Sequence, residues 1–184
     1  MGVDEVGRGS VAGPVVVGAV VFADNCKKII GIKDSKKLSR KQRERLEPKI
    51  KKWALAVGIG QAEPDEIDKN GIIWGLNKAA ELATRQVIKK IKVSQISIDG
   101  PKTMGLEKLG IKVIPIIDGD EKIYEIAAAS IVAKVYRDKL LRKLAKKYSG
   151  YGWETNVGYG TKKHVEAIKK LGLTPFHRKT FWHG

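Results

Sequence analysis

The chain has 184 residues, of which 42% are hydrophobic and 30% charged, a length and composition that suit one globular domain. Its 36 lysines and arginines against 20 acidic residues leave a net charge of +16, which favours a polyanionic partner such as a nucleic acid. The apolar run of residues 15–23 is too short to span a bilayer, and Cys26 is the single cysteine. We therefore expect a cytoplasmic protein without a membrane segment or an intrachain disulfide.

The N-terminal part is predicted to contain three strands and one helix. Residues 2–5 and the β-branched run 14–22 predict two adjacent strands, the second of them buried on both faces. Ser39 is a candidate N-cap for a basic helix that runs to about residue 52. A third strand is predicted near residues 53–60.

The middle of the chain alternates helices and strands. Pro64 opens a short helical turn, and apolar residues at helical spacing predict a crossover helix over residues 72–91. Residues 96–100 and 111–117 predict two further strands. Each of these strands ends near acidic residues.

The C-terminal third is predicted to be helical. A long helix begins near residue 125, with one apolar and one basic face, and a loop dense in glycine and aromatic residues covers 148–160. A last helix over residues 161–171 is closed by Gly172. Strands that are joined by helices predict an α/β domain with a mixed sheet.

Acidic residues gather at the predicted strand ends. Asp4 and Glu5 end the first strand, Asp99 ends the fourth, and Asp118 or Asp120 follows the fifth. A cluster of acidic residues in a basic protein indicates a binding site for a metal ion, and carboxylate oxygens suit Mg²⁺ or Mn²⁺. Two such ions held about 3.5–4 Å apart assist phosphodiester cleavage by activating water and stabilising the leaving oxygen.

Strand geometry constrains the first pair of acids. Successive side chains of a strand point to opposite faces, so Asp4 and Glu5 cannot both face one site from regular β structure. We therefore expect Glu5 to lie where the strand is already turning. Gly7 and Gly9 permit such a turn and let main-chain N–H groups approach a ligand closely.

Two common nucleotide-binding motifs are excluded. The glycine segment of residues 7–13 does not match the dinucleotide-binding pattern, because Pro14 after it opens a strand instead of a helix. The phosphate-binding pattern G-x-x-x-x-G-K-[ST] is also absent from the sequence. A nicotinamide-dependent enzyme and a P-loop nucleotide hydrolase are thus disfavoured.

A set of ordered motifs spans residues 2–181 and resembles the ribonuclease HII family. The matching segments are residues 2–9, 12–15, 34–38, 98–99, 119–120, 126–135, 137–138 and 158–161, with His164, His177, Arg178 and Phe181. The sequence departs from the family's common residues at Val6, Glu121 and Val157.

The resemblance implies a ribonuclease H-like fold of the α/β class, with a five-stranded mixed sheet flanked by helices and a helical C-terminal segment. Residues 1–184 would form a single catalytic domain, in which residues 148–184 help to form the substrate groove. The implied activity is endonucleolytic cleavage of the RNA strand of RNA/DNA hybrids, and of single ribonucleotides embedded in duplex DNA, assisted by Mg²⁺ or Mn²⁺.

The resemblance also assigns the metal-binding catalytic carboxylates. They would be Asp4, Glu5, Asp99 and Asp120. Asp118 stands two residues before the matching position and would be a neighbour of the site.

Substrate contacts are implied as well. The main chain of Gly7, Arg8 and Gly9 would read the ribose 2′-OH at an RNA-to-DNA junction, and Tyr159 would stack on the adjoining deoxyribose. Candidate phosphate contacts, each of which has the alternative of capping, pairing or packing, are Lys36, Lys37, Ser130, Lys134, Arg137, His164 and Arg178.

The expected partners are RNA/DNA hybrids and ribonucleotide-containing duplex DNA, bound by a monomer. No extension for docking to a replication clamp is visible in these residues, and no membrane association is expected. Three alternatives differ from this interpretation: a transposase- or resolvase-like nuclease that cuts DNA, a non-catalytic basic module that binds nucleic acid, and metal-free hydrolysis by paired carboxylates. The third would predict an aromatic-lined sugar cleft and no cationic excess.

Overall fold

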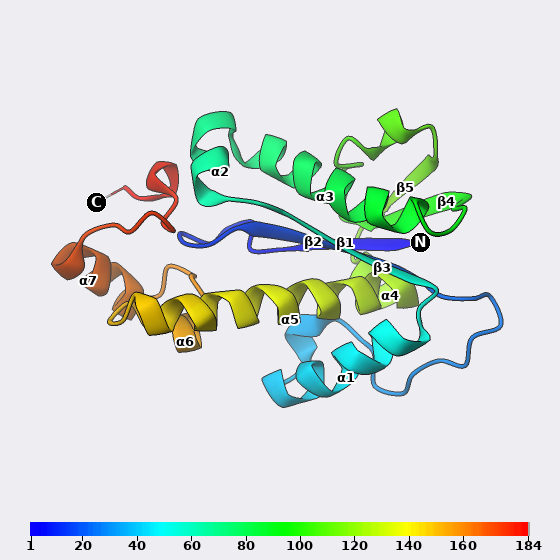
Figure 1. The fold of residues 1–184 in the computed structure, drawn as a ribbon, viewed down its shortest axis with the longest axis horizontal. Coiled ribbons are helices and arrows are strands. Elements are labelled where there is room, and N and C mark those ends of the chain that lie inside the picture. Colours follow the sequence, from blue (N-terminus) through cyan, green and yellow to red (C-terminus); the bar gives the residue numbers. More distant parts are fainter. Residues whose placement is uncertain (184) are drawn as a thin grey trace.

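The computed structural model describes residues 1–183, and Gly184, the last residue of the predicted domain, lies outside the described residues. A five-stranded sheet in the order β3-β2-β1-β4-β5 forms its centre (Figure 1). The strands are β1 (Gly2–Val6), β2 (Val15–Val21), β3 (Ala56–Ala62), β4 (Gln95–Asp99) and β5 (Lys112–Ile116). β2 is antiparallel to β1 and β3, whereas β1, β4 and β5 are parallel, so the predicted mixed sheet is confirmed.

Helices cover both faces of the sheet. α3 (Ile72–Ile88) lies on one face, and α5 (Tyr124–Lys147) with α1 (Arg40–Trp53) lies on the other, as Figure 1 shows. The alternation of side chains along β2 divides the core accordingly, because Val17 packs in the cluster under α3 and Val20 in the cluster under α5. The predicted arrangement of a sheet flanked by helices is thus also confirmed.

Glycines let the two long helices approach the sheet closely. A Cβ atom on Gly60 of β3 would lie 2.0 Å from the carbonyl oxygen of Ala79 in α3. On the opposite face, a Cβ atom on Gly18 of β2 would lie 2.6 Å from the carbonyl oxygen of Ala129 in α5. Only a residue without a side chain fits at such contacts. These glycines therefore set the distance between the sheet and the two long helices, of which α5 carries Ser130, Lys134 and Arg137.

Shorter elements complete the fold. They are η1 (Ser35–Lys37), α2 (Pro64–Asn70), η2 (Leu106–Leu109), α4 (Gly119–Lys122), α6 (Trp153–Asn156), α7 (Lys162–Leu171) and η3 (Lys179–Phe181). The C-terminal elements gather at the end of α5 (Figure 1), where Leu141, Trp153 and Ile168 share a third apolar cluster. No helix within residues 1–183 combines the length and the apolar character needed to cross a membrane.

Three predicted boundaries are wrong. β3 begins at Ala56, because Trp53 still belongs to α1, whose last turn closes when the Ala54 N–H donates to the Ile50 carbonyl. α3 ends at Ile88, three residues before the predicted end. Glu5 lies inside the paired part of β1, which continues to Val6, so the chain turns after Glu5 and not at it.

We predict that Gly60→Ala strongly destabilises the fold. The added methyl group would overlap the main chain of α3, and overpacking of this kind costs about 1–3 kcal/mol or more. Urea unfolding of the two proteins measures the difference. Gly9→Ala is the matched control, since a Cβ atom there meets nothing within 4 Å. Equal urea midpoints for Gly60→Ala and the parent would contradict the close helix–sheet contact.

Candidate active site

Three carboxylates meet at the carboxyl end of β1 and β4. These strands are parallel neighbours in which Val3 pairs with Ile98, so the following residues, Asp4 and Asp99, lie side by side. Asp4, Glu5 and Asp99 each place one carboxylate oxygen within 4.8 Å of the other two. Neighbouring strand ends, far apart in sequence, thereby form one oxygen-rich site.

The end of the β1–β4 ladder explains how Asp4 and Glu5 reach the same site from one strand. Both residues pair with β2, so β1 is still regular there and their side chains leave its opposite faces. The pairing with β4, however, ends at Val3 and Ile98. Beyond that point β4 is no longer paired with β1, so on this side of β1 the side chains from both faces can meet.

The electrostatics of this cluster favour a bound cation. Burial raises the pKa of Asp4 well above its usual range, and the charges of Glu5 and Asp99 raise it further. Burial, followed by the charge of Asp99, also raises the pKa of Glu5. A cation among these oxygens would offset the repulsion and keep the carboxylates ionised.

Asp120 stands beside this cluster on α4. The N–H groups of Gly119 and Asp120 donate to Asp99 Oδ1 at 2.8 and 3.4 Å, which ties the start of α4 to the end of β4. The side chain of Asp120 is almost fully buried, and its Oδ2 lies 3.4 Å from Lys36 Nζ. Burial and the charge of Asp99 raise the pKa of Asp120. Asp120 thus extends the acidic cluster toward η1.

Asp118 is directed elsewhere. Its side chain is 69% exposed, and its Oδ2 lies 3.9 Å from Lys122 Nζ. Its main chain is left-handed, with φ of 55°, as the chain turns from β5 into α4. Of the two acids that follow β5, the fold brings Asp120 toward Asp99 and leaves Asp118 in solvent.

A hollow of about 480 Å³ joins three of the four predicted metal ligands, though not Asp120, to most of the predicted substrate contacts. The predicted site residues among those that line it are Asp4, Glu5, Gly7, Arg8, Gly9, Lys36, Asp99, Lys134 and Tyr159. Gly7 is buried with φ of +84°, whereas Arg8 and Gly9 are exposed. The tip of this loop therefore presents its main chain to solvent beside the carboxylates.

Several predicted phosphate contacts are buried, which argues against direct contact with a phosphate. Arg178 is fully buried and donates to the carbonyls of Gly13 and Arg8. Ser130 is also buried, and its hydroxyl donates to the Ala127 carbonyl while it accepts from a main-chain N–H of η1. Each side chain already holds main-chain groups of the site, a role that the sequence pattern could not distinguish from phosphate binding.

Arg137 is a further buried anchor. Its guanidinium donates to the carbonyls of Ala12, Pro14 and Val157 at 2.8–2.9 Å. A Cβ atom on Gly7 would lie 2.1 Å from Arg137 Nε. Arg137 therefore holds together the loop after β1 and the segment before Tyr159, instead of facing a phosphate.

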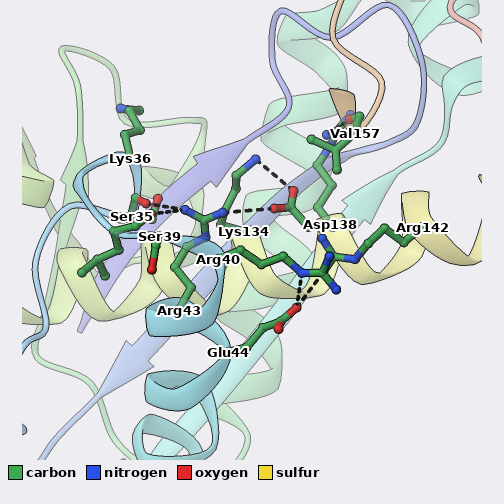
Figure 2. A network of polar contacts seen from close by, with 12 residues as sticks. Ser35, Lys36, Ser39, Arg40, Arg43, Glu44, Lys134, Asp138, Arg142 and Val157 are labelled. Carbon is green, nitrogen blue, oxygen red and sulfur yellow. Dashed lines mark hydrogen bonds and ion pairs between the residues drawn. The ribbon is translucent and has the colours of Figure 1, made fainter. Parts of the chain in front are cut away.

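A charged network joins α1, η1 and α5 (Figure 2). Arg43 of α1 donates to the Ser35 carbonyl at 2.9 Å and lies 3.6 Å from Asp138 of α5, whose other carboxylate oxygen is 2.9 Å from Lys134 Nζ. Lys36, on the same turn as Ser35, keeps a 79% exposed side chain. Arg43 and Asp138 were not predicted as site residues, although Asp138 belongs to a motif that the sequence comparison singled out.

The remaining exposed lysine of this turn is already paired. Lys37 Nζ lies 2.6 Å from Glu121 Oε1, and both side chains are about half exposed. Such an exposed pair contributes little to stability, so the fold does not depend on it.

Tyr159 lies above two cations, in a segment held by buried histidines. Lys134 Nζ is 5.4 Å and Arg137 Cζ 5.5 Å from the centre of its ring. Its carbonyl accepts from His164 Nδ1 at 2.9 Å, and His164 Nε2 lies 3.1 Å from His177 Nε2. His164 is fully buried, which favours packing over phosphate contact, the two alternatives predicted for it.

We predict that the two buried histidines make the fold acid-sensitive. Burial, reinforced by His164, lowers the pKa of His177 to about 4, and burial lowers that of His164. The unfolded chain protonates near pH 6.5, so this contribution to stability is complete above that pH and is lost as pH falls toward 4. The slope is at most about 1.4 kcal/mol per pH unit for each histidine.

The measurement is the free energy of unfolding between pH 7.5 and 4.5, compared with His177→Gln. The carboxylates titrate in both proteins, so the difference between them isolates the histidine. If the two free energies changed in parallel over this range, His177 would titrate freely in the folded protein.

Comparisons with known proteins agree with this geometry. The family model described as ribonuclease HII matches residues 1–183. The chain is 50% identical to a ribonuclease HII of Clostridium acetobutylicum, over 98% of this chain and 70% of that protein. It is 48% identical to a ribonuclease HII of Pelagibacter ubique, over 98% of this chain and 94% of that protein.

A solved structure of a ribonuclease HII is also similar to this chain. A chain from the PCNA:RNase HII complex of Archaeoglobus fulgidus superposes with a TM-score of 0.78 at 29% identity, covering 100% of this chain and 95% of that chain. Sequence and structure therefore agree over nearly the whole length: the chain belongs to the ribonuclease HII family and is a ribonuclease H, a hydrolase that acts as an endoribonuclease.

Proposed function

We propose that this protein cleaves the RNA strand of RNA/DNA hybrids and cuts duplex DNA at single embedded ribonucleotides, with a divalent metal ion bound by Asp4, Glu5, Asp99 and Asp120. One observation carries the proposal. The same hollow is lined by an oxygen-rich acidic cluster, by an open main-chain loop at Arg8 and Gly9, and by a partly exposed tyrosine.

The donor set fits Mg²⁺ or Mn²⁺. Asp4, Glu5 and Asp99 offer carboxylate oxygens only, which are the ligands that these hard cations prefer, and no histidine or cysteine is in the cluster. Burial, followed by the charges of neighbouring carboxylates, raises the pKa values of Asp4 and Glu5, and a bound cation would relieve this repulsion. When bound, such an ion supplies Lewis-acid activation of water and neutralises charge on the scissile phosphate.

The basic residues near the acids are suited to positioning the phosphate backbone. The exposed ammonium group of Lys36 lies beside Asp120, at the edge of the acidic cluster. Lys37, on the same turn, and Arg8, on the loop after β1, are also exposed. Cations outside the cluster would hold neighbouring phosphates while the acids hold the metal.

The loop of residues 7–9 is suited to recognition of the ribose. Gly7 is enclosed, but Gly9 is exposed and has open space around its Cα atom. Main-chain groups at Arg8 and Gly9 could therefore approach a 2′-OH without steric hindrance, and the 2′-OH is what distinguishes RNA from DNA.

Tyr159 would form the opposite wall, contributed by the C-terminal segment. Its ring packs near Lys134 and Arg137 and lines the hollow. Aromatic rings provide stacking platforms for nucleic acids. Segment 148–184, which contributes Tyr159, would thus complete the groove, and the monomeric state stays a prediction.

We expect Asp120→Asn to reduce cleavage of an RNA/DNA hybrid by about 100-fold or more, because changes even to groups that support metal ligands cost about 10–100-fold. Hybrid binding should change little, since the lysines and not the acids hold phosphate. Asp118→Asn is the matched control, because Asp118 is exposed and directed away. Single-turnover cleavage in Mg²⁺ and in Mn²⁺ measures both. An inactive Asp118→Asn beside an active Asp120→Asn would reverse the assignment.

We expect Tyr159→Ala to lower cleavage at a single ribonucleotide by about 10-fold, from lost stacking worth about 1–3 kcal/mol. Continuous hybrids should lose less, because neighbouring ribonucleotides offer alternative registers. kcat/KM on the two duplexes is the measurement. Losses that are equal for the two duplexes in Tyr159→Ala would remove the junction-reading role from this residue.

Gly9→Ala should reduce kcat/KM for both duplexes at unchanged stability, because its methyl group points into open space where the ribose would lie.

A further inference from the structure

A buried polar network lies directly behind Tyr159. Trp153 Nε1 donates to His164 Nε2 at 2.9 Å, and His164 Nε2 also lies 3.1 Å from His177 Nε2. The Thr174 N–H donates to His177 Nδ1 at 2.8 Å. Trp153 and His164 are fully buried and His177 almost so. The network links α6, α7 and the segment before η3.

The donors of this network determine the protonation of both rings. The indole N–H of Trp153 can only donate, so His164 Nε2 carries no proton. The main-chain N–H of Thr174 can only donate as well, so His177 Nδ1 carries no proton and its Nε2–H donates to His164 Nε2. Each neutral ring has one proton, and that of His164 is therefore on Nδ1.

That single proton is directed at the main chain of Tyr159. His164 Nδ1 lies 2.9 Å from the Tyr159 carbonyl oxygen, which also accepts from the Thr161 N–H at 2.8 Å. The Tyr159 N–H donates to the Asn156 carbonyl at 3.0 Å. Main-chain groups on both sides of the Tyr159 Cα atom are thus held, and His164 is the one side chain among these partners.

We propose that His164 is a positioning residue for ribonucleotide recognition, which acts by directing its Nδ1–H at the Tyr159 carbonyl and so fixes the ring at the groove. Trp153 and His177 select the tautomer that makes this donation possible. The proposal rests on the junction-reading role proposed above for Tyr159. This positioning role of His164 differs from a purely structural role, because loss of a structural contact would lower cleavage of all substrates alike or not at all.

Two substitutions of the same residue separate the two ring nitrogens. His164→Asn places an amide N–H₂ near the position of Nδ1, so it can still donate to Tyr159 but cannot accept from Trp153. His164→Gln places an amide oxygen near the position of Nε2, so it can still accept from Trp153 but cannot donate to Tyr159. Urea unfolding shows whether each variant is folded at the assay temperature.

The readout is the ratio of kcat/KM for a duplex with one ribonucleotide to kcat/KM for a continuous RNA/DNA hybrid. We expect His164→Gln to lower this ratio about fivefold, the effect expected from one hydrogen bond. His164→Asn should keep the ratio of the parent, even though it leaves the Trp153 N–H unpaired and lowers stability. In a Tyr159→Ala background, His164→Gln should have no further effect on the ratio.

The outcomes distinguish this proposal from the one on which it rests. An unchanged ratio in Tyr159→Ala would remove the junction-reading role, and with it the consequence proposed for His164. A lowered ratio in Tyr159→Ala with an unchanged ratio in His164→Gln would overturn the positioning role alone. The ¹⁵N NMR spectrum of the imidazoles tests the geometry without any variant: we expect His164 to be protonated at Nδ1 and His177 at Nε2, and the reverse pattern would overturn the proposal.

Discussion

The arrangement of the site depends on the guanidinium of Arg137. Fully buried on α5, it donates to the carbonyls of Ala12 and Pro14 after β1 and of Val157 shortly before Tyr159. These hydrogen bonds replace the water that the cation loses on burial. Removal of the guanidinium would leave three carbonyls to find other partners, at a cost of about 1–3 kcal/mol for each that stays buried and unpaired. Two loops from opposite ends of the chain therefore share one internal anchor.

The same guanidinium explains why two glycines of one short motif have different roles. A side chain at Gly7 would collide with Arg137, and its φ of +84° is a conformation that other residues rarely adopt. A side chain at Gly9 would meet nothing. Gly7 is thus required by the packing of the protein itself, whereas open space at Gly9 is useful only if a ligand approaches the loop.

A second constraint is the accumulation of negative charge at the end of the β1–β4 ladder. Within residues 1–183, the ion pair of Lys36 with Asp120 is the one that joins a basic side chain to the four predicted ligands. The protein carries a net charge of +16, but most of that charge lies on solvated side chains, where water and salt screen it. Burial and mutual repulsion therefore dominate the pKa of Asp4. A cation would therefore relieve repulsion at this cluster, even though the protein as a whole is strongly basic.

The sequence alone determined the order of strands and helices, the α/β class and the acids at the strand ends, because periodicity and turn residues are local properties. The choice of Asp120 over Asp118 came from a motif resemblance and not from periodicity. Tertiary structure decided which groups meet: the β1–β4 register brings Asp4 beside Asp99, and the end of that ladder lets Glu5 join them from regular strand. It also placed Arg137, Ser130, His164 and Arg178 in the interior. A sequence motif shows that a basic or polar side chain is present, but whether that side chain faces a phosphate or a main-chain carbonyl depends on packing between distant segments. Arg178 and the Arg8 carbonyl to which it donates, for example, are 170 residues apart in the sequence.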